Sequence, residues 1–232
     1  MRHSVRLVVF DLAGTTVDDG AHVAEAFTTA LRPHGVTLGP DAIAGVRGTS
    51  KREAISRLLA PGPDHEDRLI EAYSAFRRHL LAAYASTPVT PVHGAIDLFR
   101  RLRRDGTRVA LNTGFDRTIT EAILDQVGWR RETVDVVICG DDVSAGRPAP
   151  YMIFRAMELT GITSVHDVMN VGDTVNDLWA GFHAGVHWNV GVLSGAHDEA
   201  RLAGAPHTAI LPSIATIESL FEEASWSRTP NG

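Results

Sequence analysis

The feature that most constrains this chain is a repeated order of short apolar runs and amphipathic helical patterns. Six runs rich in β-branched residues are typical of buried strands, and they lie at 6–11, 108–113, 134–139, 168–171, 188–192 and 208–211. Helical patterns lie between the later runs, at 96–104, 117–127, 150–159 and 175–184. Strands that alternate with helices favour a parallel sheet with right-handed crossovers. The sequence therefore predicts an α/β fold with a Rossmann-like parallel sheet.

The segment between the first two strands breaks this order. It lacks a good strand pattern and has helical patterns separated by loops with proline and glycine, at 21–31, 51–59 and 66–85. We therefore expect an α-helical cap domain over residues 19–88. The α/β core domain would then consist of residues 1–18 and 89–232. The linkers near 18–20 and 86–91 are the expected hinges.

Composition and charge exclude several classes of protein. With 44% apolar residues in a chain of 232, there is enough material for a core. The net charge of −6 predicts no broad basic surface for nucleic acid or an anionic membrane. No apolar stretch approaches the roughly 20 residues of a membrane helix, and the single cysteine, Cys139, excludes an intramolecular disulfide. We expect a cytoplasmic protein whose partner is a small molecule.

Polar residues follow the strands at the points where ligands bind in open α/β sheets, beyond the carboxyl ends. Asp11 ends the first strand and Thr113 ends the second. Arg147 follows the third in a Gly-Arg-Pro segment, and Asp173 follows the fourth, with Asp177 four residues later. Because the ends of parallel strands meet at one edge, we expect these side chains to lie close together.

Three of these residues are carboxylates, which suggests phosphoryl transfer. A carboxylate can attack phosphorus and form an aspartyl-phosphate when a cation neutralises the gathered negative charge. Mg²⁺ binds one or two carboxylates together with waters and substrate oxygens. We expect Asp11 to be the nucleophile and a metal ligand, with Asp173 and Asp177 binding the same ion. The alternative for each aspartate is a helix N-cap.

Donors for the phosphoryl oxygens come from the other two strand ends. The hydroxyl of Thr113 and the backbone N–H of Gly114 could hold the phosphoryl group. Arg147 adds a positive charge and a fork of donors. Taken singly, a Thr-Gly pair is mostly a turn, and an arginine before proline is mostly a solvated loop charge. Together and in this order, these residues favour an active site.

These four ordered segments, with a helical insertion after the first, resemble the haloacid dehalogenase superfamily of aspartate-nucleophile hydrolases. The resemblance covers nearly the whole chain and implies a Rossmann-like core with a cap of the C1 type. It implies that Asp11 is the nucleophile, that Thr113 binds phosphoryl oxygens and that Mg²⁺ is the cofactor. Arg147 stands where the superfamily usually has lysine.

One position departs from the phosphatases of that superfamily. They usually have a second aspartate two residues after the nucleophile, which protonates the leaving alkoxide, and here that position is Ala13. Its carbonyl oxygen can bind Mg²⁺, but its side chain gives no proton. An alkoxide that leaves without a positioned acid loses about 10²–10⁴-fold in rate. Either the enzyme is a poor ester phosphatase, or the proton comes from elsewhere, or the leaving group is not an alkoxide.

The first motif and the Gly-Arg-Pro segment closely resemble phosphonoacetaldehyde hydrolases (phosphonatases) and phosphonatase-like hydrolases. In phosphonatases a cap lysine forms a Schiff base with the aldehyde, so that the carbon leaving phosphorus becomes an enamine. Lys51 is the only lysine in the chain, and the Gly-x-x-Lys spacing from Gly48 matches that segment. The resemblance implies that Lys51 forms the imine. The alternative is an exposed charge in the first turn of a cap helix.

Other residues of the same region extend or weaken this resemblance. Arg47 and Gly48 belong to a cap loop that would face the metal and read the distal end of the substrate. Phosphonatases have histidine three residues after the lysine and tyrosine after Thr-Gly, whereas this chain has Ala54 and Phe115.

Phosphonatases are often dimers through their caps, which implies a homodimer. Two acidic residues after the first motif are expected to cap the first cap helix, namely Asp18 and Asp19.

The sequence leaves three functions open. The first is Mg²⁺-dependent cleavage of the C–P bond of phosphonoacetaldehyde or a related phosphonate, through Asp11 and Lys51. The second is a phosphatase that acts on a small phosphate ester or anhydride. The third is an inactive protein that binds a phosphorylated metabolite, which the crowded carboxylates argue against because their repulsion is costly.

Overall fold

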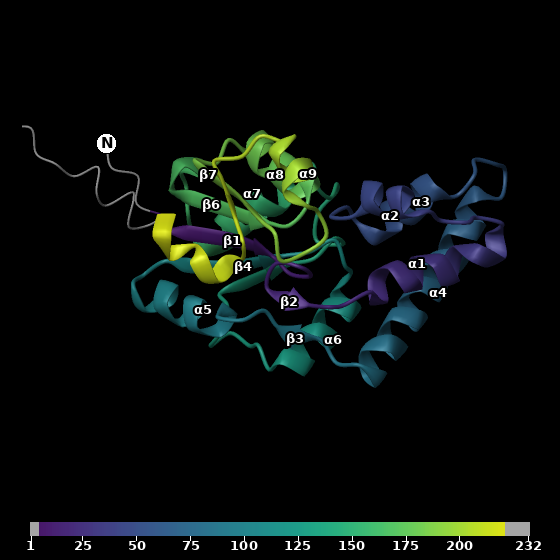
Figure 1. Cartoon of the computed structure of the whole chain (residues 1–232), viewed down its shortest axis with the longest axis horizontal. Helices are drawn as coiled ribbons and strands as arrows, with labels where there is room; N and C mark the ends of the chain where they lie inside the picture. The colour runs from purple at the N-terminus through teal and green to yellow at the C-terminus, as the bar shows by residue number, and fades with distance from the viewer. Residues whose placement is uncertain (1–4, 221–232) are drawn as a thin grey trace, which may run out of the picture.

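A single parallel sheet forms the centre of the molecule (Figure 1). The structure, a computed structural model, describes residues 5–220. The sheet has the strand order β5-β4-β1-β6-β7-β8. Its strands are β1 (Leu7–Asp11), β4 (Arg108–Asn112), β5 (Val136–Ile138), β6 (Val168–Gly172), β7 (Trp188–Val192) and β8 (Ala209–Leu211). The prediction of an α/β fold with a parallel sheet is confirmed.

Alternate residues of the central strand β1 face two different layers of helices. Val8 and Phe10 belong to a buried cluster with residues of α5 and α6. Leu7 and Val9 belong to a second cluster with residues of α7 and α8. The helices of the core are α5 (Ala95–Arg104), α6 (Arg117–Val127), α7 (Tyr151–Thr160), α8 (Val175–Ala184) and α9 (Glu199–Ala203). Because both faces of β1 are buried, its sequence is a continuous apolar run rather than an alternating one.

The predicted cap segment forms a group of helices beside the sheet (Figure 1). They are α1 (His22–Leu31), α2 (Pro40–Val46), α3 (Lys51–Leu58) and α4 (His65–Ser86). The chain leaves and re-enters the core through an antiparallel pair of short strands, β2 (Val17–Asp18) and β3 (Thr90–Pro91). The proposed cap boundaries, residues 19 and 88, lie on the helical side of this pair.

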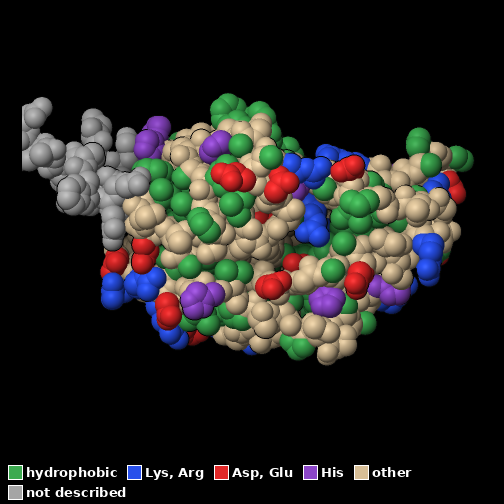
Figure 2. All heavy atoms as spheres, in the orientation of Figure 1, with side chains coloured by type: hydrophobic (Ala, Val, Ile, Leu, Met, Phe, Trp, Pro, Cys, Tyr) green, Lys and Arg blue, Asp and Glu red, His purple; other side chains and the backbone are tan. Residues whose placement is uncertain are grey.

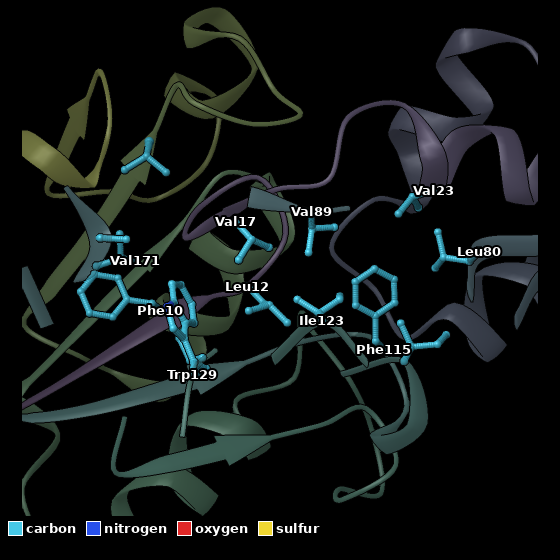
Figure 3. Close-up of a cluster of buried hydrophobic side chains, with 14 of the residues drawn as sticks. Phe10, Leu12, Val17, Val23, Leu80, Val89, Phe115, Ile123, Trp129 and Val171 are labelled. Atoms are coloured by element: carbon cyan, nitrogen blue, oxygen red, sulfur yellow. The ribbon is translucent and has the colours of Figure 1, made fainter. Parts of the chain in front are cut away.

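Apolar packing is continuous from the sheet into the cap. Figure 3 shows one buried cluster that runs from Phe10 on β1 through Leu12 and Phe115 to Leu80 on α4. All four side chains are at most 1% exposed. The cap therefore rests on the core through a shared hydrophobic cluster, and contact between the two does not depend on polar groups alone.

Several short elements differ from the predictions. The sequence reasoning missed α2, α9 and the β2–β3 pair, as well as the 3-10 helices η1 (Arg32–His34), η2 (Val165–Asp167) and η3 (Ile214–Thr216). The predicted capping of α1 by Asp18 or Asp19 is wrong, because Ala21 is the N-cap residue and α1 has no side-chain cap. Asp18 instead accepts a hydrogen bond from the backbone N–H of Gly20 at 3.0 Å.

None of the helices in the described part of the chain combines the length and the apolar composition that a membrane crossing requires.

Candidate active site

Three buried aspartates meet at the carboxyl edge of the sheet. Asp11 ends β1, Asp173 follows the neighbouring strand β6, and Asp177 lies in the first turn of α8. Each has a carboxylate oxygen within 4.8 Å of the others, and each is at most 5% exposed. The structure thus brings together the three carboxylates that the strand ends predicted.

Local hydrogen bonds hold these carboxylates in place. Thr174 is the N-cap of α8 and forms a capping box with Asp177, whose side chain accepts the backbone N–H of Thr174 at 2.9 Å. Asp173 accepts hydrogen bonds from the Thr15 hydroxyl at 3.1 Å and from the backbone N–H of Ala196 at 2.6 Å. Since two backbone N–H groups and the buried Thr15 hydroxyl donate to them, the carboxylates are oriented before any ligand binds.

Arg147 lies between two of the aspartates. Its Nη1 donates to Oδ1 of Asp11 at 2.6 Å and also pairs with Oδ1 of Asp177. Burial would lower the pKa of Arg147, but the carboxylates of Asp11 and Asp177 outweigh burial and raise it. The sequence predicted Arg147 beside the phosphoryl group, whereas in the structure its guanidinium contacts the carboxylate of Asp11. Its Nε atom is buried and has no hydrogen-bond partner among residues 5–220.

The electrostatics of this cluster suit a divalent cation. Burial raises the pKa of Asp11 to about 6, although the charge of Arg147 opposes this shift. Burial and the neighbouring Asp177 raise the pKa of Asp173 to about 6. Three carboxylates share one guanidinium, so negative charge remains in excess in a desolvated place, which is costly. The oxygen donors are those that hard divalent ions prefer, and the residues present therefore fit such an ion.

A cavity opens beside the aspartates, where the α1–α4 group meets the sheet. Figure 2 shows basic side chains, in blue, in this region of the surface. Of the predicted site residues, the cavity is lined by Asp11, Ala13, Arg47, Gly48, Lys51, Thr113, Gly114, Arg147 and Asp173. Asp177 contacts the site through its ion pair with Arg147. Residues that are far apart in the sequence thus share one small cavity, as predicted.

Lys51 is buried in this cavity, at the N-terminal end of α3. Lys51 is only 7% exposed, and its Nζ lies 4.8 Å from the ring centroid of Phe115. Burial lowers the pKa of Lys51 to about 8, and the charge of Arg147 adds to this effect. The alternative of an exposed first-turn charge is therefore wrong. A buried amine with a lowered pKa is a suitable nucleophile toward a carbonyl carbon.

The cap loop that carries Lys51 is attached to the core by backbone contacts. The backbone N–H of Lys51 donates to the carbonyl of Gly114 at 3.0 Å. The side-chain amide of Asn176, on α8, donates to the carbonyl of Arg47 at 2.6 Å. Gly48 has a φ of +79°, and an added Cβ would lie 2.2 Å from the hydroxyl of Thr174. The close approach of cap and core therefore requires glycine at this position.

Sequence reasoning missed one charged residue of the cavity, Asp19. This residue lines the cavity together with Asp11 and Lys51. Burial raises its pKa to about 6, while the positive charges of Lys51 and Arg47 oppose the shift. Its position directly before Gly20, at the predicted hinge, is the signal that could have placed it next to the site.

A family model for haloacid dehalogenase-like hydrolases matches residues 5–185. The chain belongs to the haloacid dehalogenase-like hydrolases. Among curated proteins, this hydrolase is 29% identical to the phosphonoacetaldehyde hydrolase of Bacteroides fragilis over 94% of its own length and 86% of that protein. It is 32% identical to the phosphonoacetaldehyde hydrolase of Bacillus cereus over 84% of its length and 78% of that protein.

Solved structures share the fold of this hydrolase. A phosphonoacetaldehyde hydrolase-like protein from Oleispira antarctica superposes with a TM-score of 0.83 at 21% identity, over 97% of this chain and 94% of that one. A haloacid dehalogenase-like hydrolase from Bacteroides fragilis superposes with a TM-score of 0.78 at 20% identity, over 92% of this chain and all of that one. The predicted resemblance to the superfamily and to its phosphonatase-like branch is confirmed.

Proposed function

We propose that this hydrolase cleaves the carbon–phosphorus bond of phosphonoacetaldehyde or a closely related phosphonate. Asp11 accepts the phosphoryl group, and Lys51 forms a Schiff base with the aldehyde. Asp11, Asp173, Asp177 and the carbonyl of Ala13 would hold Mg²⁺, which would supply neutralising charge to the phosphoryl oxygens. The observation that carries this proposal is the burial of Lys51 in the same cavity as Asp11.

The leaving group explains the need for Lys51. A carbon that leaves phosphorus as a carbanion is much less stable than an alkoxide that an acid protonates. An iminium ion on Lys51 accepts the electron pair of the C–P bond and forms an enamine, so the carbanion never exists. This chemistry needs no acid at Ala13, which accounts for the absence of the second aspartate there.

The other residues bind and orient the substrate. The donors proposed for the phosphoryl oxygens are the Thr113 hydroxyl, the N–H of Gly114 and the Nε of Arg147, which has no partner within the described part of the chain. Arg147 also holds the Asp11 carboxylate at 2.6 Å. Arg47 and Gly48 cover the cavity from the cap and limit the entry of water during the first step.

The decisive experiment measures release of inorganic phosphate from phosphonoacetaldehyde in the presence of MgCl₂, with and without borohydride. We expect turnover that borohydride abolishes, together with a reduced adduct on Lys51, because the imine becomes a stable secondary amine. Since the chain has one lysine, digestion and mass spectrometry distinguish this adduct from the N-terminal amine. The matched control is Lys51→Arg, which keeps the charge but cannot form an imine.

Two results would overturn the proposal. Turnover of phosphate esters alone, unaffected by borohydride and retained in Lys51→Arg, would identify a phosphatase whose acid lies elsewhere in the cap. Turnover of phosphonoacetaldehyde by Lys51→Arg at the wild-type rate would show that the C–P bond breaks without an imine.

A further inference from the structure

We propose that Asp19 is the proton-transfer partner of Lys51, a role that rests on the imine chemistry proposed above. Asp19 lies in the connection between β2 and α1, beyond the first motif. Its side chain lines the same cavity as Lys51 and Asp11. Asp19 is thus part of the predicted hinge in the sequence, and in the structure it lies at the candidate active site.

The surroundings of Asp19 hold its carboxyl group at the cavity. Oδ2 of Asp19 accepts a hydrogen bond of 3.5 Å from the hydroxyl of Tyr84, a fully buried residue of the cap helix α4. The positive charges that act on Asp19 are those of Lys51 and Arg47, and the negative charge of Asp11 opposes them. Burial, the largest effect, raises the pKa of Asp19 to about 6, and the pKa of Lys51 is lowered to about 8.

Elimination within the cavity points to the same carboxyl group. Among the described residues that line it, Asp11 is held by Arg147, and Asp173 is held by Thr15 and Ala196. The two arginines stay protonated and cannot exchange protons at neutral pH. Asp19 is the remaining lining carboxyl group, and the pKa values of Asp19 and Lys51 are close enough for proton exchange between them.

Imine formation requires such a partner. Asp19 takes one proton from the Lys51 ammonium, which leaves a neutral amine and a carboxylic acid. The amine nitrogen bonds to the aldehyde carbon, and one N–H proton passes to the former carbonyl oxygen. Asp19 then returns its proton to the departing hydroxyl, which leaves as water while the C=N bond of the iminium ion forms. The net change is an ammonium ion and an aldehyde giving an iminium ion and one water.

The test isolates this step from phosphoryl transfer. Acetaldehyde, which carries no phosphorus, is incubated with the protein and cyanoborohydride, and mass spectrometry follows the ethyl group added to Lys51 between pH 5 and pH 9. Asp19→Asn keeps the shape of the side chain and removes its acid–base function. The matched control is Asp18→Asn, the same change at the adjacent exposed residue.

We expect Asp19→Asn to slow labelling of Lys51 by about 10²-fold, as for loss of a general acid–base group. Protonation of Lys51 should make labelling decline below about pH 8 in every variant. Asp19→Asn should remove the additional decline near pH 6 that protonation of Asp19 causes, while Asp18→Asn stays near the wild-type rate. Tyr84→Phe, which keeps the carboxylate but removes a donor to it, should move this additional decline to higher pH. A merely structural role of Asp19 would not change the pH profile in these two ways.

Labelling by Asp19→Asn at the wild-type rate, with an unchanged pH profile, would overturn the role of Asp19 and leave the imine chemistry intact. If wild-type protein forms no adduct at Lys51 while it still turns over phosphonoacetaldehyde, the proposed imine itself is wrong, and the role of Asp19 falls with it. Circular dichroism of each variant shows whether it is folded, and Tyr84→Phe gives an independent reading if Asp19→Asn is not.

Discussion

At the scale of single residues, the charge balance of the site depends on Arg147. Its guanidinium contacts Asp11 and Asp177, and all three side chains are buried. We expect Arg147→Met to destabilise the metal-free protein by about 3–5 kcal/mol at pH 7, because two buried carboxylates lose their counter-charge. The measurement is urea unfolding, together with phosphate release, which should also be lost.

The control for this variant is an arginine whose ion pair is exposed. Arg155 pairs with Glu158 on the surface of α7, with 43% and 68% of the side chains exposed. Arg155→Met should change the free energy of unfolding by no more than about 1 kcal/mol. Equal losses in the two variants would contradict the argument that burial makes the Arg147 pairs important.

Residues at the ends of strands could be placed from the strand pattern, whereas the ion pairs of Arg147 and the position of Asp19 could not. Asp11 and Asp173 could be placed together because parallel strands end at one edge of a sheet. The ion pairs of Arg147 depend on the path of the loop before α7, which has no periodic pattern. Asp19 looked like a helix cap because acidic residues just before a helix usually are.

At the scale of elements, the loop between α2 and α3 sets how closely the cap approaches the core. Gly48 has a positive φ and would clash with Thr174 if it carried a Cβ. Gly48→Ala should therefore displace this loop and move Lys51 away from Asp11. Because catalysis depends on near-ångström placement, we expect kcat/KM to fall by about 10²-fold, while the urea unfolding of the core changes little.

Gly45 offers a matched control for this prediction. It lies in α2, three residues before Gly48, and an added Cβ would meet nothing within 4 Å. Gly45→Ala should keep full activity and stabilise α2 by up to about 1 kcal/mol, since alanine is the better helix former. Retained activity in Gly48→Ala would show that the observed approach of cap and core is not needed for turnover.

Long elements with a strong pattern were predicted well, and short ones were missed. The bounds of α6 and α8 are the predicted ones, because an amphipathic pattern and a glycine stop mark each helix. Helix α2 has seven residues, and α9 has five, too few for a periodic signal. The strands β2 and β3 have two residues each. They are defined only by their pairing with each other, and the whole cap segment separates them in the sequence.

At the scale of the whole molecule, we expect the stability of the protein to depend on pH and on metal. The pKa of Asp11 is raised from its ordinary value of 3.8 to about 6, because burial disfavours the carboxylate. Below pH 3.8 both the folded and the unfolded protein hold this proton. Between 3.8 and 6 only the folded state holds it, so the stabilisation that protonation gives is lost as the pH rises through 6. A shift of this size corresponds to about 3 kcal/mol.

The free energy of unfolding of wild-type protein minus that of Asp11→Asn should therefore fall as the pH rises from 4 to 7 in the absence of metal. The variant serves as the reference because it carries every other titrating group but cannot lose this proton. A divalent ion binds the carboxylate form, so MgCl₂ should raise the unfolding temperature of wild-type protein above pH 6 and have little effect at pH 4. Urea and thermal unfolding across this pH range measure both quantities. A difference that rises with pH without metal would contradict the raised pKa of Asp11. An equal effect of MgCl₂ on Asp11→Asn would mean that Asp11 is not a metal ligand.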